Sequence, residues 1–327
     1  MKKWLNRLIG GTDGGAPAST APAPVADTAA AAPADTGVDL AWYRWLTASG
    51  EPDTGGGDGA VLLERLHALA RDPAGAAGLV PRVPEVVPQL LHSLADEGAS
   101  TADLARQVAQ DVVLVAEVIR EANSAYYRPI TPVKNAEAAI VMLGENGLRM
   151  LLARIAFRPV INMPADRFVR HAIPRVWDQS VKCALAASLM APGLSTGVFE
   201  CYLAGLMQNL GLVIGLRLAG QLRSEGLLPG APGFAPAFVP ALLDASRQLS
   251  AAIALHWDFP RDVAEAIAAA GQPGAAHLAQ ALAQGDRIAK LRMLVDAHVL
   301  GENDALVSDG LSSFQRRCFG KLDGLEH

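Results

Sequence analysis

The sequence predicts an all-α fold, because apolar residues recur at helical spacing from about residue 60 onward and alternating strand patterns of useful length are absent. In the first such segment, Leu62, Leu66 and Leu69 fall on one side of a helix that ends at Asp72-Pro73. Hydrophobic residues make up 51% of the 327 residues, which is enough to bury a core without disulfides or metals.

The expected helices follow one another, with start and stop signals at several ends. Pro84 stands in the first turn of one helix, where its missing N–H costs little, and Ser100 precedes a capping-box-like start of another. We expect helices over 61–71, 84–95, 100–108, 112–122, 135–143, 145–157, 176–191, 198–218, 237–256, 261–270, 276–297 and 310–319.

The most apolar segment, 202–219, approaches the ~20 residues that a membrane-spanning helix needs. Its polar residues Gln208, Asn209 and Arg217 would be costly in lipid, whereas its three glycines suit close packing between helices. We therefore expect a buried core helix here.

The first sixty residues differ from the rest in composition. Residues 11–40 contain ten Ala and four Pro but no Lys or Arg, so we expect 1–60 to be a flexible extension with short apolar segments. One such segment, 40–46, holds Trp42, Tyr43 and Trp45. Two interpretations stay open for it: a short helix that docks on the main domain, or a peptide that binds a partner.

Charge and cysteine content limit the class of protein. The 33 acidic residues outnumber the 28 basic ones, which argues against a nucleic-acid partner. Cys183, Cys201 and Cys318 form neither a disulfide framework nor a metal-binding pair, so we expect a reducing cytoplasm. Residues 1–10 carry Lys and Arg opposite an apolar side, and a peripheral contact with an anionic membrane is one interpretation.

A series of short motifs follows in a fixed order along the chain. They are Leu79–Val86, Gln110–Val112, Ala122–Tyr127, Thr131–Val133, Leu143–Gly144, Val176–Ser180, Leu203–Gly211 and His256–Pro260. This set closely resembles the HDOD family, the HD-related output domains of bacterial signalling, over about 79–297. The resemblance implies a domain over 61–300, with a helical subdomain (79–160) packed on an HD-like half (165–297). Residues 301–327 would be a C-terminal tail whose last residues resemble an affinity-tag remnant.

The same resemblance locates a metal site that this chain has lost. HD-type phosphohydrolases use a His, a His-Asp pair and a later Asp to hold a metal that activates water. Here the matching positions are Gln179, the pair Gln208-Asn209, and Asp286. Neutral amides are weak replacements for imidazole and carboxylate. We therefore expect no metal, no other cofactor and no catalytic activity.

Two further sets of residues are candidates for binding a partner or ligand. The first is the loop motif Asn123, Ser124, Tyr126 and Tyr127, which also suits a purely structural role in turning the chain. The second is an arginine-rich stretch that suits an acidic protein or a nucleotide-type anion, or else a set of solvated helix faces. Its candidate residues are Arg149, Arg154, Arg158, Arg170 and Arg175.

Taken with the resemblance, these residues predict a non-catalytic regulatory protein that transmits a signal by binding a protein partner or a small anionic ligand. Two alternatives remain: a metal-dependent HD-type phosphohydrolase acting on nucleotides or cyclic nucleotides, and an adaptor tethered to the membrane by its basic amphipathic N-terminus.

Overall fold

Helices supply the regular secondary structure of this protein, and no strand occurs among the described residues, which confirms the predicted all-α class. The computed structural model describes residues 36–48, 59–74, 108, 112–161, 167–228, 237–257 and 259–325. The helix predicted at 84–95, nearly all of that at 100–108, and the membrane contact predicted for 1–10 lie outside these residues.

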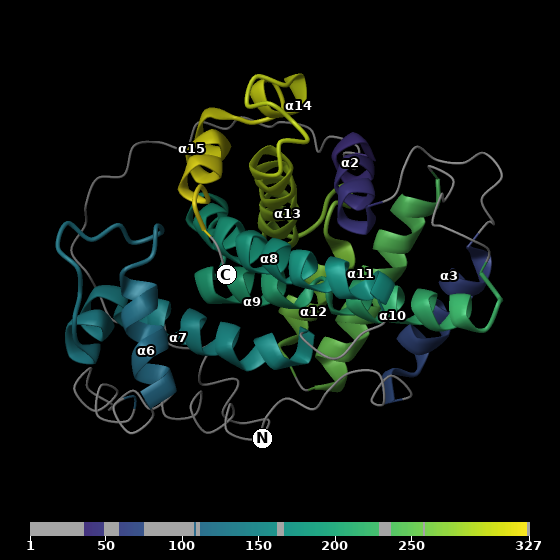
Figure 1. The fold of residues 1–327 in the computed structure, drawn as a ribbon, viewed down its shortest axis with the longest axis horizontal. Coiled ribbons are helices and arrows are strands. Elements are labelled where there is room, and N and C mark those ends of the chain that lie inside the picture. Colours follow the sequence, from purple (N-terminus) through teal and green to yellow (C-terminus); the bar gives the residue numbers. More distant parts are fainter. Residues whose placement is uncertain are drawn as a thin grey trace.

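The chain order of the helices is shown in Figure 1. They are α2 (Thr36–Thr47), α3 (Ala60–Arg71), α6 (Val112–Ala122), α7 (Ala136–Ile161), α8 (Arg167–Met190), the 3-10 turn η2 (Ala191–Leu194), α9 (Val198–Met207), α10 (Leu210–Ser224), α11 (Phe238–His256), α12 (Arg261–Ala269), α13 (His277–Asp296), α14 (Ala305–Ser308) and α15 (Ser313–Lys321).

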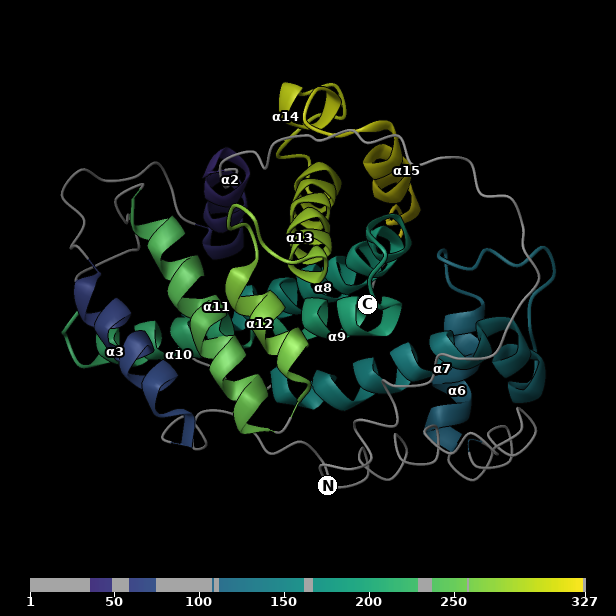
Figure 2. The same cartoon turned by 180° about the vertical axis from the view of Figure 1, so that it is seen from behind.

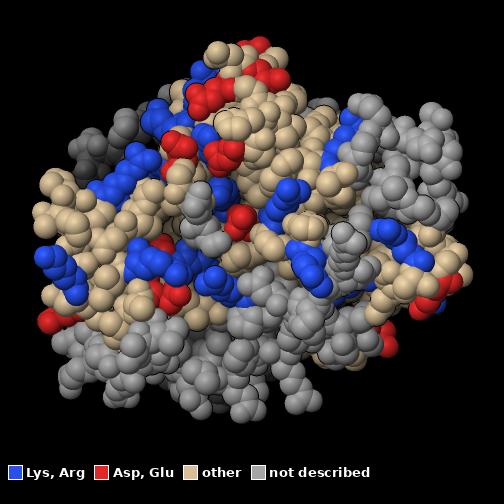
Figure 3. Space-filling view, viewed as in Figure 1, with Lys and Arg blue, Asp and Glu red and all other residues tan. Residues whose placement is uncertain are grey.

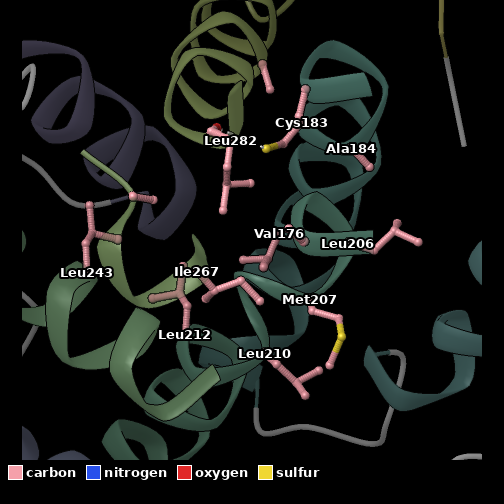
Figure 4. Packing of buried hydrophobic residues seen from close by; sticks show 14 of the residues in the cluster. Val176, Cys183, Ala184, Leu206, Met207, Leu210, Leu212, Leu243, Ile267 and Leu282 are labelled. Atoms are coloured by element: carbon pink, nitrogen blue, oxygen red, sulfur yellow. Dashed lines mark hydrogen bonds between the residues drawn. The ribbon is translucent and has the colours of Figure 1, made fainter. Parts of the chain in front are cut away.

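The larger of two hydrophobic clusters holds helices α8 to α13 together. Helix α8 packs most extensively on α13 and next on α9, while α10, α11 and α3 pack side by side (Figure 2). Figure 4 shows side chains from these helices converging, with Val176 and Cys183 of α8 near Leu282 of α13 and Ile267 of α12. This cluster therefore fixes the relative positions of α8, α9 and α13.

A smaller cluster joins α6 to α7. It contains Val118 of α6 and Ile140, Leu148 and Leu151 of α7. Helix α7 breaks at Gly144, whose backbone has φ 66° and ψ −179°, a conformation that favours glycine. The two helices expected on either side of residue 144 are therefore present, joined by this break.

Close approach of α9 and α13 to α8 depends on small residues. A Cβ on Gly205 of α9 would lie 2.4 Å from the Cα of Ala184, and one on Gly285 of α13 would lie 2.7 Å from the backbone N of Ala187. Both distances are far below contact, so only glycine lets these helices pack at this spacing. Gly285 directly precedes Asp286, so the close packing also positions that carboxylate against α8.

Two of the helices expected in the larger cluster differ from expectation. Helix α8 begins at Arg167 rather than at 176 and continues through Pro174. The buried side chains of Ala172 and Ile173 favour this extension, because packing outweighs the hydrogen bond that proline removes. The single helix expected over 198–218 is two helices, which meet at a turn formed by Gln208 and Asn209.

The apolar stretch Val198–Ser224 spans α9, α10 and the turn between them. By length and composition it would suffice to cross a membrane, but 89% of its most apolar window is buried against other parts of the fold. The expected buried core element is therefore present, although as two helices rather than one.

Two segments near the ends of the chain also pack on the larger cluster. Within the extension expected to be flexible, Thr36–Thr47 is a helix, because its apolar side buries Trp42 and Leu46 against the main cluster. Of the two interpretations left open for this segment, the structure has the docked helix. The expected C-terminal tail packs too, since α15 buries Phe319, and even Leu325 is buried, with its carbonyl accepting a hydrogen bond from Lys182.

The packing at Gly205 predicts the outcome of adding one methyl group. We expect Gly205→Ala to lower the free energy of unfolding by about 1–3 kcal/mol, because the clash with Ala184 exceeds the gain in helix propensity. Chemical denaturation of the purified full chain measures this. Gly215→Ala in α10 is the matched control, since its added Cβ would meet Leu66 at an ordinary 3.4 Å. Equal effects of the two substitutions would contradict the account.

Candidate functional site

The structure brings together Gln179, Gln208, Asn209 and Asp286, the four side chains predicted to stand at the metal-ligand positions of HD-type enzymes. Gln179 of α8 donates from Nε2 to Asp286 Oδ1 at 2.5 Å, and Gln208 donates from Nε2 to the same oxygen at 3.0 Å. Asn209 donates to the side-chain oxygen of Gln179 and to Ser180 Oγ. All of the amides are buried, so this is a closed polar network within an apolar core.

A lysine completes the network. Lys290 lies one turn after Asp286 on α13, and its ammonium donates to Asp286 Oδ2 at 2.6 Å and to Asp39 Oδ1 of α2 at 2.7 Å. Its side chain is only 3% exposed. Burial lowers the pKa of Lys290, but the carboxylates of Asp286 and Asp39 more than offset this and raise the pKa above its usual range. Lys290 is therefore a buried cation held between two carboxylates.

The turn that carries Gln208 and Asn209 is held by a serine of a neighbouring helix. Ser250 of α11 donates to the Gln208 carbonyl at 2.7 Å and accepts from the Gly211 N–H at 2.8 Å. These two bonds satisfy backbone groups that the break between α9 and α10 would otherwise leave unpaired. The break in turn directs the Gln208 and Asn209 side chains toward α8 and α13.

This arrangement does not fit a divalent metal. A metal ligand must offer a lone pair, but Gln179 and Gln208 direct their N–H groups at Asp286, an orientation that the acceptor-only carboxylate requires. The second oxygen of Asp286 is bound by the Lys290 ammonium. These four side chains therefore do not offer the ligands that a metal-activated hydroxide would need, and in the part of the chain that the structure describes no group of three His, Cys, Asp or Glu side chains is placed to hold a metal ion.

Cys183 borders the network on the side of α8. Gln208 Nε2 lies 2.9 Å from its sulfur. Burial, and next the charge of Asp286, raise the pKa of this thiol well above its usual range. Cys183 is therefore a protonated, space-filling side chain rather than a nucleophile.

The candidate loop residue Asn123 braces the connection between α6 and α7. Its Nδ2 donates to the carbonyls of Ile119 and Val133, and its Oδ1 accepts from the Val133 N–H, all at 2.8 Å. The side chain thus closes a loop of ten residues, which gives it a structural role. Its neighbour Ser124 has a buried hydroxyl with no hydrogen-bond partner among the described residues.

The candidate tyrosines lie between the two hydrophobic clusters. The rings of Tyr126 and Tyr127 meet edge to face with centroids 5.1 Å apart. Nearby, Arg154 of α7 forms a buried ion pair with Glu121 of α6. Burial raises the pKa of Tyr127 above its usual range, so the phenol stays protonated. Arg154 is therefore engaged in a contact within the protein.

Two further arginines of α7 also face acidic residues. Arg149 lies 3.5 Å from Glu145, and its guanidinium stacks 5.3 Å from the centre of the Phe199 ring. Arg158 lies 4.0 Å from Glu117 of α6. On the face drawn in Figure 3, Lys and Arg side chains stand beside Asp and Glu side chains at several places, and no broad described region is uniformly basic.

The two candidate arginines of α8 have different surroundings. Arg170 is exposed on the first turn of the helix. Arg175 donates to the Trp45 carbonyl of α2 at 2.7 Å, and its guanidinium lies 4.4 Å from the centre of the Trp45 ring. Four of the five candidate arginines thus make separate contacts within the protein and Arg170 is exposed, and the role of all five in binding a partner or an anion stays a prediction.

Sequence reasoning missed three residues of the polar network: Asp39, Ser250 and Lys290. Lys290 carried a usable signal, because a lysine four residues after Asp286 on one helix can reach its carboxylate. The other two carried none, since Asp39 lies 251 residues from Lys290 and Ser250 lies 42 residues from Gln208.

The pairing of Lys290 predicts a large loss of stability when its charge is removed. We expect Lys290→Met to lower the free energy of unfolding by about 3–5 kcal/mol, because it leaves the largely buried Asp286 carboxylate without its cationic partner. Adding Asp286→Asn should recover part of the loss. Urea denaturation of the full chain measures both. Lys134→Met, at an exposed lysine, is the control, and a loss no larger than that of the control would contradict the pairing.

The turn at Gln208 predicts opposite effects for two serines one turn apart on α11. We expect Ser250→Ala to lower the free energy of unfolding by about 1–3 kcal/mol, because it leaves buried backbone groups of the turn unpaired. Ser246→Ala should be neutral or stabilising, since the buried Ser246 hydroxyl has no partner among the described residues. Thermal denaturation of both variants checks this. Equal melting temperatures would argue against a bracing role for Ser250.

Comparison with known proteins identifies the domain. The model of the family described as HDOD domain matches residues 80–273, which is more than half of the chain. A curated, uncharacterised protein of Treponema pallidum is 23% identical over 148 residues, which cover 45% of this chain and 28% of that protein. The chain therefore matches well under two thirds of this relative's length.

Solved structures share the fold at low identity. A candidate metal-dependent phosphohydrolase from Shewanella amazonensis is 20% identical with a TM-score of 0.56, covering 81% of this chain and 99% of that one. An HDOD domain protein of unknown function from Geobacter sulfurreducens is 20% identical with a TM-score of 0.55 (80% and 94%). A candidate signal transduction protein from Marinobacter aquaeolei is 20% identical with a TM-score of 0.51 (86% and 72%).

Proposed function

Because this chain belongs to the HDOD domain family, we propose that it is a non-catalytic signalling protein, which acts by binding a partner rather than by hydrolysing a phosphoester. One observation carries the proposal: the Asp286 carboxylate is bound by the amide N–H groups of Gln179 and Gln208 and by the ammonium of Lys290. Hydrogen-bond donors stand where an HD-type enzyme needs metal ligands.

Hydrolysis by this route would need a water molecule made acidic by a metal. The Lys290 ammonium supplies positive charge at Asp286, but it has no open coordination position at which a water could bind and ionise. Gln179 and Gln208 are neutral over the whole physiological pH range, so neither can act as a general base. The side chains of the polar network can bind and position groups, but they offer no nucleophile.

The limited access to the polar network also argues against hydrolysis. Gln179 has no exposed surface, and helix α2 lies over the side of α13 that carries Lys290, with Asp39 bound to it. Asp286 itself is only 18% exposed, so a phosphoester would reach little of its carboxylate. The negative charge of the phosphoester would then meet a carboxylate.

The proposed partner is a protein of a signalling pathway. A small anionic ligand is the second class of partner that we propose, and we expect no binding of nucleic acid. One similar solved structure is named as a candidate signal transduction protein, which supports the pathway type by analogy of fold alone. A reducing cytoplasm is part of the proposal, because Cys183, Cys201 and Cys318 are all free thiols in the structure.

A metal-dependent phosphohydrolase is the second candidate, because Asp286 is retained and one similar solved structure carries that name. Metal content and hydrolysis separate the two. The full chain would be loaded with Mn²⁺, Fe²⁺ or Ni²⁺, desalted, analysed by mass spectrometry of the metal, and assayed with bis(p-nitrophenyl) phosphate. We expect far less than one metal ion per chain, and hydrolysis no faster than the buffer rate.

The matched variant for this assay is Asp286→Asn, which keeps the shape of the side chain and removes its charge. We expect the wild type and the variant to give the same metal content and the same rate. About one metal ion per wild-type chain, with metal and turnover both lost in the variant, would overturn the proposal in favour of the enzyme.

A further inference from the structure

Helix α2 fills a groove whose polar contacts suit only one direction of a bound helix. It packs against α8, α11 and α13, and buries Val38, Trp42, Tyr43 and Leu46. Figures 1 and 2 both show it beside α13, at the edge of the larger helical body. The groove therefore takes a helix whose apolar residues recur at spacings of three and four.

The two ends of the groove carry cations that suit the two ends of that helix. Lys290 pairs with Asp39 in the first turn of α2 and lies 5.0 Å from the centre of the Trp42 ring. At the other end, Arg175 donates to the Trp45 carbonyl and, at 3.5 Å, to the Leu46 carbonyl. A cation at the C-terminal carbonyls is favoured by the helix dipole, so the reverse direction would lose this contact.

Removal of α2 would leave no uncompensated buried charge. Lys290 would keep its bond to Asp286, and Asp39 would pass into water. The half-buried Arg175 can also turn to solvent. The docked helix carries one unsatisfied donor, because the indole N–H of Trp42 is buried and has no acceptor among the described residues. Release would let that group bond to water.

The sequence on either side of α2 offers little to hold it in place. The ten residues 49–58 contain four glycines and a proline, and residues 11–35 contain Val25 as their only large apolar residue. By composition, these flanking residues therefore offer few apolar side chains that could stabilise α2 beyond its own.

From these observations we propose that the groove between α8, α11 and α13 is a helix-docking site that α2 occupies as an intrachain ligand. The partner it fits is an amphipathic helix with a carboxylate in its first turn and Trp, Tyr and Leu side chains on one face. Such a helix displaces α2 and pairs with Lys290 and Arg175 in its place. This deepens the proposed binding function by naming the chemistry of the partner.

Hydrogen exchange of the unmodified full chain tests whether α2 can leave. We expect the amides of α2 to exchange at least tenfold faster than those of α8 and α13, because α2 opens while the helical body stays folded. Equal protection of α2 and α13 would overturn the proposal, since α2 would then open only when the whole domain unfolds. This measurement needs no variant.

Binding of a labelled peptide with the sequence 36–48 tests whether the groove accepts a helix from outside. The full chain with Trp42→Ser, which weakens its own α2, should bind the peptide at least tenfold more tightly than wild type does. A peptide with Asp39→Lys is the matched control and should not bind. No peptide binding to the folded Trp42→Ser chain would overturn the proposal.

Native mass spectrometry of the same mixture identifies the occupant. We expect one chain with one peptide. A dimer of chains that excludes the peptide would overturn the partner-helix assignment, because a second copy would then fill the groove. None of these readouts depends on metal or turnover, so failure of the docking site and failure of the non-catalytic proposal are distinguishable.

Discussion

The rest of this structure depends on the hydrogen bonds that the Asp286 carboxylate accepts. This carboxylate accepts hydrogen bonds from Gln179 of α8, from Gln208 at the end of α9, and from Lys290 on its own helix. A largely buried carboxylate is costly unless donors surround it, and here three helices supply or carry those donors. Lys290 extends the same network to α2 through Asp39, which lies 251 residues away, so one polar cluster connects α2, α8, α9 and α13.

The apolar packing and the polar network require each other. Gly205 and Gly285 let α9 and α13 approach α8 closely, and that spacing brings the amides within hydrogen-bond distance of Asp286. In a catalytic relative a metal ion would neutralise such a carboxylate, whereas in this chain the Lys290 ammonium does so without offering a site for water. The proposed non-catalytic role thus rests on an ammonium ion that stands beside Asp286, where a catalytic relative would hold a metal ion.

Much of this could be predicted from the sequence. The spacing of apolar residues placed α11, α12 and α13 within a residue or two of their observed ends, and the motif order placed Gln179, Gln208 and Asp286 in one site. The rest depends on contacts between distant segments. The break after Met207 needs Ser250 of another helix, α8 runs through Pro174 because packing supports it, and α2 is held in part by Lys290, which is remote in sequence.

The most direct test is the titration of Lys290 itself, followed by NMR of its side-chain Cε and Nζ resonances in the full chain and assigned with Lys290→Met. Free lysines lose their proton near pH 10.4. We expect the Lys290 resonances to stay those of an ammonium ion at that pH, because two carboxylates hold the proton and raise the pKa. Titration of Lys290 together with the exposed lysines would contradict it.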